Sequence, residues 1–299
     1  MNGVGILGYD ARMRTRTWLV VGLACALCGP VGAQPAAPAA KTAPAKQAAK
    51  GQRGKKAAKV DLAPTVAALN GVDAEAAVRA AETLGASPDP AAHDALLDAL
   101  AFGMVPAVAV AAISALAQHP APPDVAALRR YAGHHNPMVR SAAIGALASY
   151  PDPAARKAVV AGLRDMAGRV RSAAAAAAAK GRVREAIEPL FELLGRNEEA
   201  AAKALAAMAD PELARKIGDQ LGKVPDTILA QTLGLVLKRP DFGPDAARVE
   251  IVRAIGKIQD HSAVAALTDY VDATPKNPPR QSRTEAQKMV EARLGGGDK

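Results

Sequence analysis

A ten-residue phrase occurs twice in this 299-residue chain, with an offset of 31 residues. Residues 139–148 read VRSAAIGALA and residues 170–179 read VRSAAAAAAA, so seven of the ten aligned positions are identical. A fixed period of this size, carried by helix-forming residues, is typical of stacked helical repeats, in which no single unit can bury its apolar face alone. The phrase therefore predicts an array of helix pairs.

Apolar residues at helical spacing recur from Asp61 onward, and Pro, Asp, Asn or Gly separates one run from the next. Asp73, Asp152 and Asp210 stand where N-caps are expected, the last two directly before a proline. Because strand patterns are absent, the sequence predicts an all-α fold. The predicted helices span residues 62–69, 73–85, 90–101, 105–118, 122–132, 137–149, 153–166, 168–180, 183–195, 198–209, 211–222 and 226–238.

The pattern changes near the C-terminus. A further helix at residues 245–258 follows the previous one too soon for a full repeat, so we expect it to lack a partner and the array to kink or restart there. Three prolines break the stack within residues 274–281. A last amphipathic helix at residues 282–294 is expected to cap the array through one apolar stripe. That stripe consists of Ala286, Met289, Val290 and Leu294.

Two phrases in the predicted array resemble a known repeat. Residues 136–148 (NPMVRSAAIGALA) and residues 251–267 (IVRAIGKIQDHSAVAAL) resemble the HEAT repeat, in the short HEAT-like form first noted in phycobilisome lyases. The resemblance covers roughly residues 61–273. It implies an armadillo/HEAT-like α-solenoid, a superhelix of antiparallel helix pairs that binds a protein or peptide partner on its concave face. The lyase activity of some relatives does not follow from it.

The N-terminus has the order of regions that marks a secretory signal peptide. Basic residues precede the apolar run Trp18–Leu27, and small residues then lead to an expected cleavage site between Ala33 and Gln34. The apolar run is too short for a permanent transmembrane helix, which needs about 20 residues. We therefore expect a bacterial protein that is secreted, periplasmic or associated with the cell envelope. The basic residues are Arg12, Arg14 and Arg16.

Two features leave alternatives open within residues 1–33. Cys25 could be lipidated, although Gly22 stands where a lipidation signal normally carries an aliphatic residue. Met13 directly precedes the basic residues and could be the true start. Cys25 and Cys28 are the only cysteines, so a chain cleaved after Ala33 would contain no thiol and no disulfide.

The excess positive charge lies in residues 34–60, an Ala-, Pro- and Lys-rich segment without an acidic residue. This composition cannot bury enough apolar surface to fold, so disorder is expected. The segment is interpreted as a tether, or alternatively as a contact to an anionic surface. Residues 61–299 contain 28 basic and 28 acidic residues, so no nucleic-acid partner is expected. The basic residues of the segment are Lys41, Lys46, Lys50, Arg53, Lys55, Lys56 and Lys59.

Arg140 and Arg171 occupy matching positions of the two phrases. They could line an anion-binding groove, but we favour a stacking ladder in which each guanidinium binds an acidic or carbonyl group of the next repeat. No catalytic, cofactor-binding or metal-binding residues are predicted. His134 and His135 are adjacent, and neighbouring side chains on a helix point in different directions, which makes a poor metal site.

The alanine run 173–179 is predicted to be a buried helix without a bulky face, because alanine is the best helix former and the run begins inside a repeat. Enlarging Ala176 or Ala177 is therefore expected to overpack a helix contact.

The function that best fits these features is a non-catalytic protein-binding scaffold exported to the cell envelope or periplasm. The first alternative is a lyase-like or other small-ligand enzyme subunit, whose pocket would lie near His134, Arg140 and Arg171. A nucleic-acid-binding HEAT-like protein is a weaker alternative that only the basic segment supports.

Overall fold

The computed structural model describes residues 61–295, and every regular element in that range is helical apart from one bridge between Leu221 and Val224. The expected signal peptide, the cleavage site at Ala33 and Gln34, Cys25 and the basic segment 34–60 lie outside the described residues. The elements are α1 (Ala63–Leu69), α2 (Ala74–Gly85), α3 (Pro90–Phe102), α4 (Pro106–Leu116), α5 (Asp124–Ala132), α6 (Pro137–Leu147), α7 (Pro153–Gly162), α8 (Gly168–Gly181), the 3-10 helix η1 (Arg184–Ala186), α9 (Ile187–Gly195), α10 (Glu199–Met208), α11 (Pro211–Gly218), α12 (Asp226–Lys238), α13 (Asp245–Lys257), α14 (Ser262–Ala273) and α15 (Gln281–Leu294).

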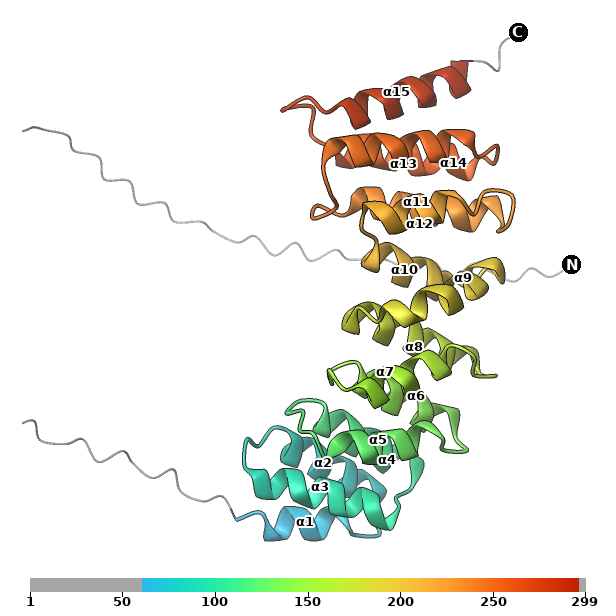
Figure 1. The fold of residues 1–299 in the computed structure, drawn as a ribbon. Helices are drawn as coiled ribbons and strands as arrows, with labels where there is room; N and C mark the ends of the chain where they lie inside the picture. The colour runs from blue at the N-terminus through green and yellow to red at the C-terminus, as the bar shows by residue number, and fades with distance from the viewer. Residues whose placement is uncertain (1–60, 296–299) are drawn as a thin grey trace, which may run out of the picture. The chain divides into compact units, whose positions relative to one another are not determined.

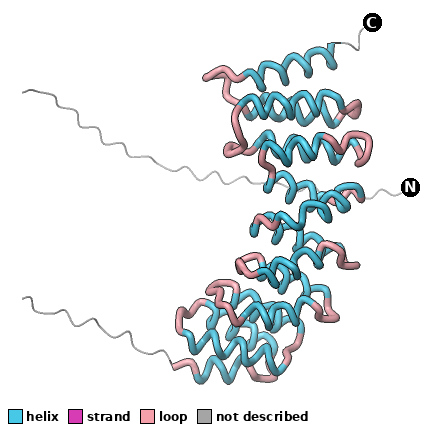
Figure 2. The backbone as a smooth tube through the Cα atoms, in the orientation of Figure 1, coloured by secondary structure: helices cyan, strands magenta, loops and turns pink. Residues whose placement is uncertain are grey.

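Consecutive helices pair, and the pairs stack in chain order from α1 to α15, so the all-α solenoid expected from the sequence is confirmed (Figures 1 and 2). The helices α2, α4, α6, α8, α10, α12 and α14 form one row, which we call the even row. The helices α3, α5, α7, α9, α11 and α13 form the odd row. Contacts between non-consecutive helices are most extensive within the even row.

The even row packs closely because small residues lie at its contacts. A Cβ atom added to Gly85 on α2 would lie only 2.5 Å from the Cβ atom of Ala115 on α4. A Cβ atom on Gly234 of α12 would lie 3.1 Å from that of Ala266 on α14. The alanine-rich composition therefore sets the spacing between repeats, because larger side chains would force the helices apart.

Helix starts follow the local chemistry read from the sequence. The carboxylates of Asp73, Asp152 and Asp210 accept hydrogen bonds from backbone N–H groups in the first turns of α2, α7 and α11, which confirms these three N-caps. Several helix ends were predicted too late. The helix expected at 153–166 ends at Gly162, because Asp165 accepts the N–H of Ala167 and stabilises a turn before α8.

The expectation that the helix at 245–258 lacks a partner is wrong. This helix is α13, and α14 (Ser262–Ala273) pairs with it after a turn of four residues. Asp260 begins that partner by accepting the backbone N–H of Ser262. The array therefore continues through this pair without a missing helix.

The terminal helix α15 packs against both α13 and α14, as expected of a cap. Ser282 is buried and joins the Tyr270 hydroxyl at 2.6 Å, while its N–H donates to Asp245 at the start of α13. Ala286 of the predicted apolar stripe is fully buried, but Leu294 is exposed. Leu294 is the last residue of the helix and lies beyond the covered surface.

The alanine run is helical, but only part of it is buried. Ala174, Ala175, Ala177 and Ala178 lie in the core of the stack, whereas Ala176 is exposed. The expectation that Ala176 is buried is wrong, because this position of α8 opens onto a surface groove between α8 and α10. No helix of residues 61–295 is long and apolar enough to cross a membrane.

Candidate functional site

Arg140 joins two repeats at the edge of the array where odd helices turn into even helices. This residue lies in the first turns of α6, and its Nε and Nη2 atoms donate to the two carboxylate oxygens of Asp165, each at 2.9 Å. Its Nη1 atom donates to the carbonyl oxygens of His134 and His135, also at 2.9 Å. One guanidinium group therefore binds its own turn and the turn of the next repeat.

Arg171 repeats this geometry one period later on α8. Its Nε atom donates to Glu198 at 2.7 Å, and its Nη1 atom donates to the carbonyl oxygens of Asp165 and Met166. Because the Asp165 carboxylate binds Arg140 and the Asp165 carbonyl binds Arg171, the two arginines meet at one residue. They connect three successive turns, which is the geometry that a stacking ladder requires.

The ion pair with Arg140 changes the electrostatics of Asp165. The guanidinium hydrogen bonds hold the pKa of Asp165 below its ordinary value despite partial burial, and the N–H of Ala167 contributes in the same direction. The pKa of Arg140 is raised by the same hydrogen bonds. Both groups therefore stay charged at neutral pH, and their charges pair with each other.

On the surface of the even row, one exposed position of four helices carries only small residues. The exposed position near the C-terminal end of four successive even helices, α4, α6, α8 and α10, recurs every 31 residues and carries Ser114, Gly145, Ala176 and Ala207. A Cβ atom added to Gly145 would meet no atom within 4 Å. A partner could therefore approach the helix backbones of this surface closely.

A groove of about 780 Å³ lies on this surface between α8 and α10. Small residues such as Ser172, Ala176 and Ala200 form its walls. The Arg171–Glu198 ion pair lies at one end. Lys203 also lines the groove and pairs with Glu199 at 2.7 Å. The groove thus has small, mostly apolar walls and charged groups at its edge.

Large apolar side chains are exposed beside this surface. Phe102 and Met166 are 91% and 92% exposed, and Val105 and Met138 are more than half exposed. Three of the four precede or begin α4, α6 and α8, and Phe102 ends α3 just before the turn into α4. They therefore lie along the same edge as the arginine ladder, over three successive repeats.

A buried polar cluster that the sequence did not reveal joins three repeats. Asp124 is fully buried, and its carboxylate lies 2.6 Å from the His93 ring and accepts the Tyr150 hydroxyl at 2.7 Å and the N–H of Ala121 at 2.8 Å. Burial and this hydrogen bond raise the pKa of Tyr150 above its ordinary value. Both carboxylate oxygens of Asp124 therefore have hydrogen-bond partners within the array. The signal of this cluster in the sequence was the 31-residue spacing of His93 and Asp124.

The His134 side chain contacts residues of its own turn, between α5 and α6. The Nδ1 atom of His134 accepts the N–H of Asn136 at 3.0 Å, and its ring stacks on Tyr131. In the part of the chain that the structure describes, no group of three or more His, Cys, Asp or Glu side chains is placed to hold a metal ion. His134 therefore serves as a structural element of this turn.

Comparison with known protein families matches residues 94–179 to HEAT repeats and residues 76–102 to the PBS lyase HEAT-like repeat. The chain contains HEAT repeats. The matched residues cover α2 to most of α8, and the helix pairs that follow continue the same pairing of consecutive helices. None of the curated protein sequences matches the chain.

The HEAT array is similar to several solved structures at low identity. The complex of CpcE and CpcF of phycocyanin lyase from Nostoc has 19% identity and a TM-score of 0.43, with 80% of this chain and 97% of that one covered. The karyopherin Kap121p, bound to the extreme C-terminus of the protein phosphatase Cdc14p, has 13% identity and a TM-score of 0.49, with 78% of this chain and 30% of that one covered. A designed armadillo repeat protein has 18% identity and a TM-score of 0.36, with 78% and 99% covered.

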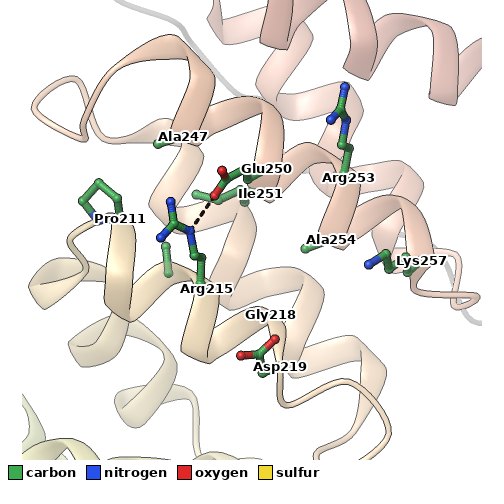
Figure 3. Close-up of a pocket in the computed structure, with 11 residues that line it drawn as sticks. Pro211, Arg215, Gly218, Asp219, Ala247, Glu250, Ile251, Arg253, Ala254 and Lys257 are labelled. Atoms are coloured by element: carbon green, nitrogen blue, oxygen red, sulfur yellow. Dashed lines mark hydrogen bonds and ion pairs between the residues drawn. The ribbon is translucent and has the colours of Figure 1, made fainter.

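The odd row of the HEAT array carries cross-helix ion pairs. A groove of about 360 Å³ separates α11 from α13, and Arg215 crosses it to Glu250 at 2.8 Å (Figure 3). Arg253 of α13 likewise pairs with Glu285 of α15 at 2.6 Å. Ion pairs therefore bridge neighbouring helices at both of these places.

Proposed function

We propose that this HEAT-repeat chain is a non-catalytic scaffold that binds a protein or peptide partner along the surface of the even row. We expect this row to be the concave face, because its helices pack closest together. The observation that carries the proposal is the group of four exposed apolar side chains, Phe102, Val105, Met138 and Met166, on the edge of that surface. The Ser, Gly and Ala residues beside them permit close approach.

The hydrogen bonding of the arginine ladder also supports a non-catalytic role. All three guanidinium nitrogens of Arg140 donate to acceptors of the protein itself. A small-ligand site at His134, Arg140 and Arg171 would need polar groups directed toward a shared pocket. These groups are instead directed toward turns of the chain.

A pull-down with the full chain tests the proposal. Wild-type chain should retain a defined protein of the cell envelope, and the double substitution Met138→Ser, Met166→Ser should abolish or strongly weaken that retention. The matched control is Leu294→Ser, which removes an exposed apolar side chain at the end of α15. Retention of no envelope protein above background, or equal retention by the double variant, would contradict the proposal.

We also propose that the chain is exported to the periplasm or cell envelope. The order of basic, apolar and small residues before Gln34 supports export. Cell fractionation together with N-terminal sequencing of the mature protein tests it. The expected N-terminal residue is Gln34, and a cytosolic chain that retains residues 1–33 would refute export.

The basic residues between 34 and 60 are proposed to contact an anionic surface after export. Each Lys or Arg near an acidic membrane contributes on the order of 1 kcal/mol to such a contact. The mature chain should therefore be retained on vesicles with anionic lipid at low salt, and deletion of residues 34–60 should remove this retention. Unchanged retention after the deletion would mean that the segment is only a tether.

A further inference from the structure

The balanced charge of the HEAT array conceals a strong separation of charge along the chain. Residues 61–120 contain seven acidic residues and one basic residue, whereas residues 121–184 contain three acidic and eleven basic residues. The basic part corresponds to α5–α8. A concentrated charge of one sign creates a local potential that attracts ligands of the opposite sign.

Some basic residues of this part already have acidic partners within the array. Arg140 and Arg171 pair with Asp165 and Glu198 at the turn edge. On the odd row, Arg164 binds Glu192 of α9 at 3.2 Å, and Arg156 of α7 approaches Glu185 at 3.9 Å. The cations on this side of α7 therefore face carboxylates of the next repeat.

On the opposite side of α7, the basic side chains lack such acidic partners in the described part of the chain. A groove of about 720 Å³ separates α5 from α7, and it is lined by Arg129 and Arg130 from α5 and by Lys157 from α7. Within residues 61–295, none of these three side chains has a carboxylate oxygen within 4 Å. Positive charges thus approach the groove from both walls, in contrast to the Arg215–Glu250 pair across the groove in Figure 3.

Asp165 also lines this groove, but its charge does not neutralise Arg129, Arg130 and Lys157. Both carboxylate oxygens of Asp165 accept hydrogen bonds from Arg140, and one also accepts the N–H of Ala167. Arg130 is held in place, because its Nη2 atom donates to the carbonyl of Leu100 at 2.7 Å and its guanidinium lies near the Tyr131 ring. Cations on the two walls of one groove repel each other, and an anionic ligand would relieve this repulsion.

We propose that the groove between α5 and α7 binds a short acidic peptide segment of a partner protein, whose carboxylates pair with Arg129, Arg130 and Lys157. The rest of the lining is mostly small, including Ala126, Ala154, Ala158 and Ala161, and this leaves room for an extended chain. The groove lies on the odd row and is therefore distinct from the even-row surface proposed above. The two sites could bind different segments.

The neighbouring helices argue for a short peptide rather than a long polyanion. Asp94 and Asp98 are exposed on α3, and Glu188 and Glu192 are exposed on α9. A nucleic acid or an anionic membrane extending along the row would bring phosphates against these carboxylates, whereas a short acidic segment would avoid them.

The test is fluorescence anisotropy with the full chain and a short labelled peptide of alternating Asp and Ala. The peptide should bind at low salt, and Arg129→Glu with Lys157→Glu should weaken binding by roughly tenfold or more. The matched control is Arg196→Glu with Lys223→Glu, which reverses two exposed charges outside the groove, in the turns before α10 and α12. The control should retain most of the affinity. Thermal unfolding confirms that each variant is folded.

Three results would overturn the proposal. The first is the absence of peptide binding to the wild-type chain. The second is an equal loss in the two double variants, because it would indicate unspecific attraction, including attraction by residues 34–60. The third is binding of a single-stranded oligonucleotide or an anionic vesicle that exceeds peptide binding and depends on Arg129 and Lys157. Failure of the even-row pull-down would leave this result unaffected, so the two proposals are tested separately.

Discussion

Arg140 and Asp165 form a bidentate ion pair across two successive HEAT repeats, with both N–O distances at 2.9 Å. Their side chains are only 14% and 16% exposed, so solvent screens the pair less than it screens a surface pair. The same guanidinium also holds the carbonyl groups of its own turn. The pair therefore fixes how one repeat sits on the next.

Replacing Arg140 by Ala should destabilise the array by about 1–3 kcal/mol, because Asp165 would lose two charged hydrogen bonds in a partly buried site. Urea unfolding measures this effect. The matched control is Arg164→Ala, whose pair with Glu192 is 61% and 52% exposed and is worth at most about 1 kcal/mol. Unchanged stability of Arg140→Ala, combined with weaker partner binding, would show that the stacking interpretation of Arg140 is wrong.

Acid should weaken the same contact. Because the folded-state pKa of Asp165 lies below its unfolded value, its contribution to stability is complete above the unfolded pKa and is lost as the pH falls through the folded pKa. Asp165→Asn should therefore reduce the dependence of unfolding free energy on pH below about pH 4. In the Arg140→Ala background the same substitution should have a smaller effect. An equal effect in both backgrounds would show that Arg140 is not the cause.

Two glycines should respond oppositely to alanine. In Gly85→Ala the new methyl group would collide with Ala115 of α4, and the expected loss is roughly 1–3 kcal/mol. Gly145→Ala places a methyl group in open space on α6, and the expected gain is about 0.5–1 kcal/mol from helix propensity. Equilibrium unfolding of both variants tests the close packing of the even row. A neutral Gly85→Ala variant would mean that α2 and α4 can move apart.

Leucine should distinguish two adjacent alanines of α8. Ala177 is 3% exposed, so Ala177→Leu should overpack the core at a cost of about 1–3 kcal/mol. Ala176 is exposed and lines the groove between α8 and α10, so Ala176→Leu should leave the melting temperature nearly unchanged. The latter variant should instead interfere with a partner on the even row. Equal melting temperatures for the two variants would contradict this assignment of buried and exposed positions.

Much of the fold could be read from local patterns. The repeat period, the alanine-rich helices and the aspartate N-caps depend on residues near one another in the chain, so the sequence alone could predict them. The sequence analysis assigned no helix to residues 262–273 and therefore expected α13 to lack a partner. This error was also local, because these residues form the helix α14. Predicted helix ends at 118, 149, 166 and 222 ran too far, because turn hydrogen bonds such as that of Asp165 end a helix without a proline.

The functional surfaces required contacts between repeats. The ladder of Arg140 and Arg171 could be expected from their matching positions, but their shared contact at Asp165 could not. The His93–Asp124–Tyr150 cluster was missed because its three members lie in three different repeats. Exposure of Met166 and Phe102 likewise depends on how the turns lie beside the even helices.

The sequence by itself determined the helix pair as the unit, its period near 31 residues and the small side chains that allow close stacking. Helix formation, capping and periodicity act over a few residues, which explains why they can be read without a structure. Only the tertiary structure decided which charges meet. Arg156 and Arg164 approach carboxylates of the next repeat on one side of α7, while Arg129, Arg130 and Lys157 line one groove on the other side. Such pairing depends on the rotation of each helix against its neighbour, and packing over the whole stack sets that rotation.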